Sequence, residues 1–209
     1  PARPDGAAIP GEYMKRSVFI AGLSSDIGNK LAWRFYQNSW EITGSARDAS
    51  VSLCQAVSCD VSKPQSIADA AARFAAFNQP WDLFIGSIGD LAPIGKFFEL
   101  DPHAWATSVA VNSIGQLQLL HALWPHRAAA KPAKVCFLVG GGINGPFPNY
   151  SAYCLGKVML VKACELLQDE YGDDIHAVAL GTGWVNTKIH AATLEAGAEH
   201  AGPNFEKTK

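Results

Sequence analysis

The chain has 209 residues, of which 48% are hydrophobic and 17% charged, with a formal net charge of -2. This length suits one domain with one core. The near-neutral charge offers no surface for a polyanion, so we expect no nucleic-acid partner. No apolar run approaches the ~20 residues of a membrane-spanning helix, and the N-terminus lacks a signal-peptide pattern. We therefore expect no membrane contact and a cytoplasmic location.

The cysteines and the N-terminal segment limit the structural possibilities further. The five cysteines are odd in number, lack CxxC spacing and lie partly in apolar runs, as Cys136 does. Small buried hydrophobes occur in such runs, so the pattern predicts neither disulfides nor a metal site. Residues 1–13 are rich in Pro, Ala and Gly without periodicity. We interpret them as a disordered leader or an artificial remnant and residues 14–209 as the folded domain.

Strands and helices are predicted to alternate along the chain. Residues 17–21 form an apolar run that ends at a glycine turn, which indicates a buried strand. Residues 27–37 carry apolar side chains at helical spacing. The same patterns predict strands near 40–44, 56–59, 81–85, 134–139 and 176–180, and helices over 64–77, 105–123 and 151–170. After His190 the pattern is polar and irregular. About six strands in this order predict a single-domain α/β fold, a doubly wound parallel sheet between two helix layers.

The segment GLSSDIG at 22–28 lies between the first strand and the first helix. Glycines there allow a tight turn and a close approach of the backbone to a pyrophosphate, which free amides and the helix dipole attract. An ordinary strand-to-helix turn is the alternative for this segment alone.

Tyr153 and Lys157 are four residues apart and so share one face of the helix that begins near Ser151. A neighbouring ammonium lowers the pKa of a phenol, which suits proton exchange with a carbonyl or an alcohol. A structural pair on a helix surface is the alternative.

Together these motifs resemble the short-chain dehydrogenase/reductase family. The family pattern TGxxxGIG corresponds to AGLSSDIG at 21–28, and YSAYCLGK at 150–157 resembles its active-site helix. The resemblance covers residues 17–190. It implies a Rossmann-type NAD(P)-binding fold and hydride transfer between nicotinamide and a carbonyl or secondary alcohol. Tyr153 would be the general acid/base, Lys157 would lower its pKa and bind the ribose, and Asn112 would hold a proton-relay water.

The resemblance also implies the cofactor contacts. Asp26 replaces the middle glycine of the turn, and we expect its carboxylate to face away from the pyrophosphate and cap the helix. Asp60, Gly89 and Asn112 have structural alternatives as a turn former, a loop glycine and a helix amide. The implied contacts are Gly22, Ser24, Ser25, Ile27, Gly28, Asp60, Val61, Gly86, Ser87, Ile88, Gly89, Tyr153, Lys157, Gly183, Val185 and Thr187.

The choice between NAD and NADP depends on the end of the second strand, GSARD at 44–48. Ala46 fills the place of the acidic residue that selects NAD, and Arg47 follows it. A basic residue there pairs with the 2′-phosphate of NADP. We therefore expect NADP, with Ser45 and Arg47 as phosphate contacts, although Asp48 could instead pair with Arg47.

The chain departs from the family at the catalytic serine, whose place thirteen residues before Tyr153 is taken by Gly140. The loop that we expect near the substrate contains Gly140, Gly141, Gly142 and Asn144. Loss of one oriented donor typically costs ~10²–10³ in rate. A loop amide or the Asn144 side chain could supply the donor, the chemistry could be specialised, or the protein could bind cofactor without turnover.

Two further expectations follow from the resemblance. The family's last strand has no counterpart before the chain ends at Lys209, and family members form homodimers or homotetramers through their two long helices. Besides carbonyl reduction on a small-molecule substrate, two functions stay open. One is a nucleotide-sugar epimerase or dehydratase that recycles its cofactor, and the other is a non-catalytic NADP sensor or scaffold.

Overall fold

The computed structural model describes residues 16–48, 53–129 and 132–209. The expected leader at 1–13 lies outside these residues. None of the helices described there is long and apolar enough to cross a membrane.

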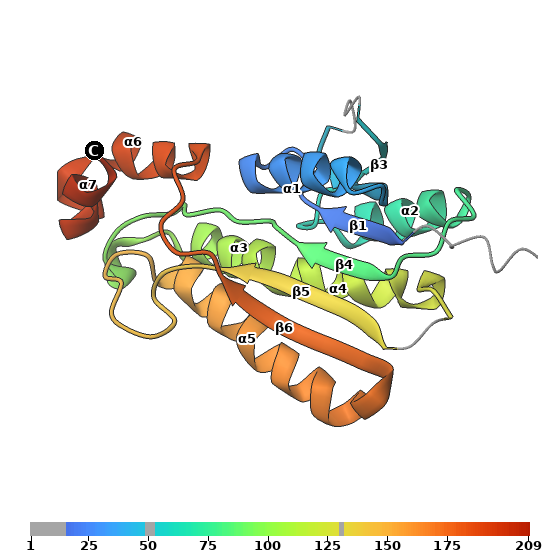
Figure 1. Ribbon diagram of the computed structural model, residues 1–209. Coiled ribbons are helices and arrows are strands. Elements are labelled where there is room, and N and C mark those ends of the chain that lie inside the picture. Colours follow the sequence, from blue (N-terminus) through green and yellow to red (C-terminus); the bar gives the residue numbers. More distant parts are fainter. Residues whose placement is uncertain (1–15, 49–52, 130–131) are drawn as a thin grey trace, which may run out of the picture.

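A six-stranded sheet forms the centre of the molecule (Figure 1). Its order is β3-β2-β1-β4-β5-β6, and all neighbouring strands pair in parallel. This confirms the predicted doubly wound fold. The strand order reverses between β1 and β4, so the crevice at their carboxyl ends is where such sheets bind ligands. The strands are β1 Ser17–Ala21, β2 Glu41–Ala46, β3 Gln55–Ser58, β4 Leu83–Gly86, β5 Ala133–Val139 and β6 Ile175–Gly181.

Helices connect the strands and cover the sheet on both faces (Figure 1). The α-helices are α1 Asp26–Gln37, α2 Pro64–Ala75, α3 Pro102–Asn112, α4 Ile114–Leu123, α5 Ser151–Tyr171, α6 Ala191–Ala201 and α7 Pro203–Thr208. Single 3-10 turns are η1 Phe97–Glu99, η2 Trp124–His126, η3 Gly172–Asp174 and η4 Lys188–His190.

Two predictions about helices are wrong. The expected helix over 105–123 begins at Pro102 and is divided at Ser113, whose φ of -142° and ψ of -77° are not helical. The segment after His190 is helical rather than irregular. Its interruption comes from Gly197, whose φ of 75° breaks the helical geometry inside α6 and hides the periodicity from a sequence pattern.

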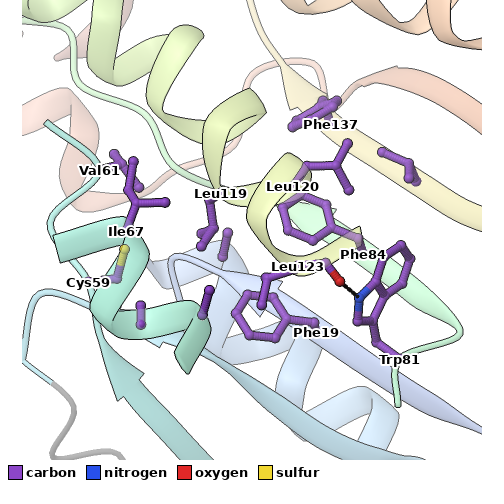
Figure 2. Packing of buried hydrophobic residues seen from close by; sticks show 14 of the residues in the cluster. Phe19, Cys59, Val61, Ile67, Trp81, Phe84, Leu119, Leu120, Leu123 and Phe137 are labelled. Carbon is purple, nitrogen blue, oxygen red and sulfur yellow. Dashed lines mark hydrogen bonds between the residues drawn. The ribbon is translucent and has the colours of Figure 1, made fainter. Parts of the chain in front are cut away.

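Alternate residues of β1 face the two apolar cores. Phe19 and Ala21 point to the larger core beneath α2, α4 and α5, whereas Val18 and Ile20 point to the smaller core beneath α1. Figure 2 shows the larger core, where the buried Trp81 donates a hydrogen bond of 2.9 Å to the carbonyl of Leu123. A strand buried on both faces is thus fixed in register, and with it the glycine turn that follows β1.

Candidate active site

A cavity of about 510 Å³ lies at the carboxyl ends of the central strands. The start of α1, the segment after β4 and the glycine loop after β5 border it, and η4 and α6 border it after β6. Predicted residues that line it are Ser25, Ile27, Ser87, Ile88, Gly89, Gly140, Gly141, Asn144, Tyr153, Lys157, Gly183, Val185 and Thr187. The fold therefore brings motifs from five parts of the chain to one place.

The glycine turn after β1 is closed by short backbone contacts. The amides of Gly22 and Leu23 both donate to the Ser45 carbonyl at 2.9 Å, and Gly22 has a φ of 93°. A Cβ on Gly28 would collide with the Gly22 carbonyl. The Ser25 hydroxyl caps α1 by accepting the Gly28 amide at 2.9 Å. Both glycines are thus required for a turn that brings backbone close to the cavity.

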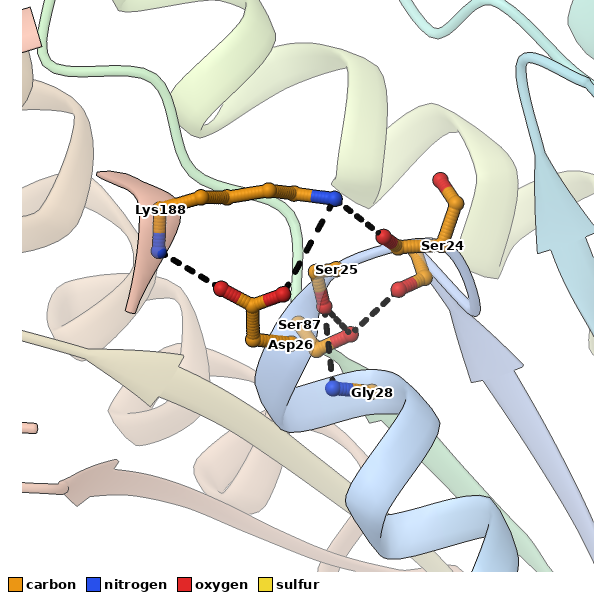
Figure 3. A network of polar contacts seen from close by, with 7 residues as sticks. Ser24, Ser25, Asp26, Gly28, Ser87 and Lys188 are labelled. Atoms are coloured by element: carbon orange, nitrogen blue, oxygen red, sulfur yellow. Dashed lines mark hydrogen bonds and ion pairs between the residues drawn. The ribbon is translucent and has the colours of Figure 1, made fainter. Parts of the chain in front are cut away.

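Asp26 does not cap α1, which corrects the prediction, because Ser25 holds that position. The Asp26 carboxylate instead accepts the backbone amide of Lys188 at 2.6 Å (Figure 3). The Lys188 ammonium lies 4.0 Å from the same carboxylate and donates to the Ser24 carbonyl at 2.6 Å. The turn is thereby joined to η4 across the cavity.

Ser87, which directly follows β4, also contacts the glycine turn after β1. Its hydroxyl donates to the Ala21 carbonyl at 2.7 Å and lies 3.3 Å from the Ser25 hydroxyl. The segment at 86–89 therefore supports the turn, and a Cβ on Gly86 would collide with the Phe137 ring.

Tyr153 and Lys157 lie on one face of α5, as predicted. Lys157 is 2% exposed, and its ammonium donates to the carbonyls of Ile88 at 2.7 Å and Leu138 at 3.1 Å. The Lys157 nitrogen is 5.7 Å from the centre of the Tyr153 ring. Both side chains line the cavity.

Burial decides the pKa of both groups. Desolvation lowers the pKa of Lys157 to about 7 and raises the pKa of Tyr153 to about 12. The expectation that Lys157 lowers the pKa of Tyr153 is therefore wrong for this structure. A lysine that loses its own charge near neutral pH stabilises a tyrosinate only weakly. The phenol keeps its proton at neutral pH and is available as a donor.

The missing serine has a steric explanation. A Cβ on Gly140 would lie less than 3.0 Å from the hydroxyl oxygen of Tyr153. Real Cβ atoms do not approach an oxygen this closely. The Tyr153 hydroxyl thus occupies the space that a side chain at position 140 would need. Gly142 is required in a similar way, since its Cβ would collide with the sulfur of Cys154.

Asn112 is a clamp for the segment after β4. Its side-chain nitrogen donates to the carbonyls of Asp90 at 2.8 Å and Ser108 at 2.9 Å, and its side-chain oxygen accepts the Asp90 amide at 3.0 Å. Its own carbonyl accepts from the Gln116 side chain at 3.0 Å. Asn112 is fully buried. These contacts show how Asn112 fixes the segment after β4, and its role in holding a relay water stays a prediction.

The predicted contacts to the distant half of the cofactor lie outside the cavity. Ser45 is 1% exposed, so its side chain cannot serve as the expected phosphate contact. Arg47 is exposed at the end of β2, where it remains accessible. Asp60 accepts from the Ser62 hydroxyl at 2.7 Å, which is the main reason why its pKa is lowered. Val61 is buried in the larger core.

Further residues that line the cavity were not predicted as site residues, among them Tyr150, Trp184, Lys188, His190 and Thr193. The Tyr150 hydroxyl donates to Thr193 at 2.9 Å, which fastens α6 over the cavity. Trp184 stacks on His190, with ring centres 4.6 Å apart. Lys188 directly follows Thr187, so its position beside a predicted contact was the one available signal.

Solved structures share this fold. The chain aligns with the KRED1-Pglu enzyme at a TM-score of 0.83 and 21% identity, covering 93% of this chain and 85% of that one. Aldohexose dehydrogenase of Thermoplasma acidophilum aligns at 0.80 and 17% identity, covering 93% and 76%. A gluconate 5-dehydrogenase of Burkholderia cenocepacia in complex with NADP and tartrate aligns at 0.78 and 18% identity, covering 88% and 77%.

Sequence relatives are also dehydrogenases. The chain is 24% identical over 193 residues to the short chain dehydrogenases mpl6 of Monascus purpureus and citE of Monascus ruber. It spans 66% of the length of each of these relatives, and the match covers 83% of this chain. Residues 22–204 match the family model described as enoyl-(acyl carrier protein) reductase. The chain therefore belongs to the short-chain dehydrogenase/reductase family.

Proposed function

We propose that the protein is an NADP(H)-dependent oxidoreductase that reduces a carbonyl compound or oxidises the corresponding secondary alcohol. The observation that carries the proposal is the meeting of Tyr153, Lys157 and the glycine turn at one cavity. Gly22 and Gly28 allow a tight turn, in which a Cβ on Gly28 would collide with the Gly22 carbonyl, and this turn leads into the start of α1, which suits a bound pyrophosphate. Neither alternative, cofactor recycling or a non-catalytic scaffold, is favoured by relatives that are dehydrogenases.

Tyr153 would transfer the proton. When bound, the nicotinamide supplies or accepts the hydride. With a pKa of about 12, the Tyr153 hydroxyl is protonated at neutral pH and can donate to a carbonyl oxygen beside Gly140. Lys157, held by two carbonyls, would orient the ribose. This arrangement favours the reductive direction at neutral pH.

The hydrogen bond normally given by the family's serine needs another source. Asn144, Gly140 and Gly141 line the same cavity as Tyr153. We propose that this loop supplies the second donor to the substrate oxygen. Replacement of Asn144 by Ala would then lower kcat by ~10²–10³, the usual loss for one oriented donor. An unchanged kcat would assign the donor to the loop amides.

The NADP preference rests on Arg47. Its exposed position at the end of β2, after Ala46, suits an ion pair with a 2′-phosphate. The direct test is a paired titration of the purified protein with NADPH and NADH, followed by tryptophan quenching and energy transfer to the reduced nicotinamide. We expect NADPH to bind more tightly and Arg47→Glu to remove the difference. Binding of neither dinucleotide would refute the proposed function.

Turnover needs a separate test. A panel of carbonyl compounds with NADPH should show oxidation of the cofactor at 340 nm, and Tyr153→Phe should abolish it. Tight NADPH binding without turnover of any carbonyl would instead support a sensor or scaffold.

We further propose that the protein forms a homodimer or homotetramer through α4 and α5. These helices expose Ile114, Leu155, Met159 and Leu166, which are apolar side chains suited to a buried contact. Light scattering coupled to gel filtration should give a mass of two or four chains. A monomer at micromolar concentration would refute this.

A further inference from the structure

We propose that Lys188 binds the cofactor. When the dinucleotide binds, the Lys188 ammonium would leave the glycine turn and contact the pyrophosphate. The inference rests on the proposed function and deepens it. Its starting point is the network in Figure 3, where a cation from η4 lies on the turn after β1, 164 residues away from Ser24.

The charge at position 26 makes a nearby cation necessary. Asp26 is the first residue of α1, where unpaired amides and the helix dipole attract anions. Its carboxylate is a fixed negative charge beside the place where the pyrophosphate would lie, because Asp26 itself lines the cavity. The carboxylate and the pyrophosphate would repel each other, so a dinucleotide would bind more weakly without a compensating cation.

Lys188 is placed to supply that compensation. Its ammonium is 4.0 Å from the Asp26 carboxylate, and its side chain is 66% exposed and therefore not confined by packing. The Ser24 carbonyl that it contacts at 2.6 Å belongs to the turn itself. A phosphate on this turn would offer the ammonium a stronger acceptor than a neutral carbonyl.

The backbone of Lys188 need not move when the ammonium changes partner. Its amide donates to one oxygen of Asp26 at 2.6 Å, whereas the ammonium faces the other oxygen. The carboxylate therefore anchors η4 through the main chain, and the side chain alone can rotate toward the pyrophosphate. Because η4 leads directly into α6, this contact would also hold α6 over the bound cofactor.

The test is a double-mutant cycle on the dissociation constant of NADPH, using Lys188→Met and Asp26→Asn. Asn keeps an oxygen for the Lys188 amide and removes the charge. We expect Lys188→Met to weaken binding about tenfold and Asp26→Asn to strengthen it severalfold. Lys188→Met should still weaken binding in the Asp26→Asn background, because a direct contact with phosphate does not depend on the carboxylate.

Lys162→Met is the control, since Lys162 is also an exposed lysine paired with a carboxylate, here that of Glu165, but does not line the cavity. Its dissociation constant should equal that of the wild type. Thermal unfolding without ligand verifies that each variant is folded.

The outcomes separate the two proposals. If the wild type binds neither NADPH nor NADH, the proposed function fails and Lys188 has no pyrophosphate to contact. If the wild type binds NADPH and Lys188→Met binds it equally well, only the inference about Lys188 is overturned. A loss that disappears in the Asp26→Asn background would also overturn it, because Lys188 would then act only as a counter-ion to Asp26.

Discussion

Gly140 and Tyr153 compete for one space, and this competition can be measured. We consider Gly140→Ala, which adds a single methyl group where the Tyr153 hydroxyl lies. Ordinary contact distances are about 3.5–4.0 Å, so the hydroxyl must retreat by about 1 Å or more. The tyrosine is almost fully buried, which leaves its ring little room to tilt. The substitution should therefore strain the packing of α5 against the glycine loop.

The expected cost follows from known cases of overpacking. Inserting a methyl group into a packed site typically costs about 1–3 kcal/mol of unfolding free energy. For a chain of this size, each kcal/mol lowers Tm by about 2–4 °C. Tyr153→Phe removes the colliding oxygen and leaves the ring carbon at 3.2 Å from the new Cβ, a gap that needs a shift of a few tenths of an ångström. In that background Gly140→Ala should cost less than about 1 kcal/mol.

Urea unfolding of the wild type, the two single variants and the double variant completes the cycle. Gly145→Ala is the matched control in the same loop, because no atom lies within 4 Å of its Cβ position. We expect a coupling energy of about 1–2 kcal/mol between positions 140 and 153. Additive costs within about 0.5 kcal/mol would refute the reasoning. So would a Gly140→Ser variant that is as stable as the wild type and more active.

Three further predictions concern buried polar groups. The pKa of Lys157 falls from 10.5 to about 7 on folding, so the unfolded chain binds more protons between these values and stability rises with pH. A full proton changes the free energy of unfolding by about 1.4 kcal/mol per pH unit. Urea unfolding should therefore show that this free energy rises by about 1–2 kcal/mol between pH 7.0 and 8.5 for the wild type but not for Lys157→Met. Equal pH profiles of the two proteins would contradict the lowered pKa of Lys157. Asn112→Ala leaves the amide and carbonyl of Asp90 without their partner and should lower the free energy of unfolding by about 2–3 kcal/mol. Hydrogen exchange of the Asp90 amide should become faster. An unchanged exchange rate would argue against the clamp. Tyr150→Phe and Thr193→Val each leave one buried hydroxyl unpaired and should lower the free energy of unfolding by about 1–3 kcal/mol. The double variant should lose less than the sum of the two single losses, which thermal unfolding can measure. Additive losses would mean that the two hydroxyls do not depend on each other.

The sequence predicts the sheet well because its strands are short apolar runs between turn residues. The run at 17–21 becomes β1, and the run at 134–139 becomes most of β5. The four-residue spacing of Tyr153 and Lys157 also specifies a shared helix face without tertiary information. These features depend on local sequence, which a pattern can detect.

Other features depend on contacts between distant segments and could not be predicted. The division of α3 from α4 at Ser113 accompanies the hydrogen bond from the Gln116 side chain to Asn112, which a periodicity does not reveal. The role of Asp26 depends on Lys188, far along the chain. The pKa values of Tyr153 and Lys157 follow from burial, and only the folded structure specifies how deeply each side chain lies.

The two carbonyls that hold Lys157 have a consequence for how its charge can vary. An ammonium has three N–H donors and a neutral amine has two, while the acceptors at hand, the carbonyls of Ile88 and Leu138, are also two. The amine can therefore release a proton near pH 7 and keep both hydrogen bonds. We therefore expect the electrostatic potential in the cavity to change with pH while the hydrogen bonds to Ile88 and Leu138 are kept. Lys157 can thus gain or lose its positive charge near neutral pH while its side chain stays bound to the same two carbonyls.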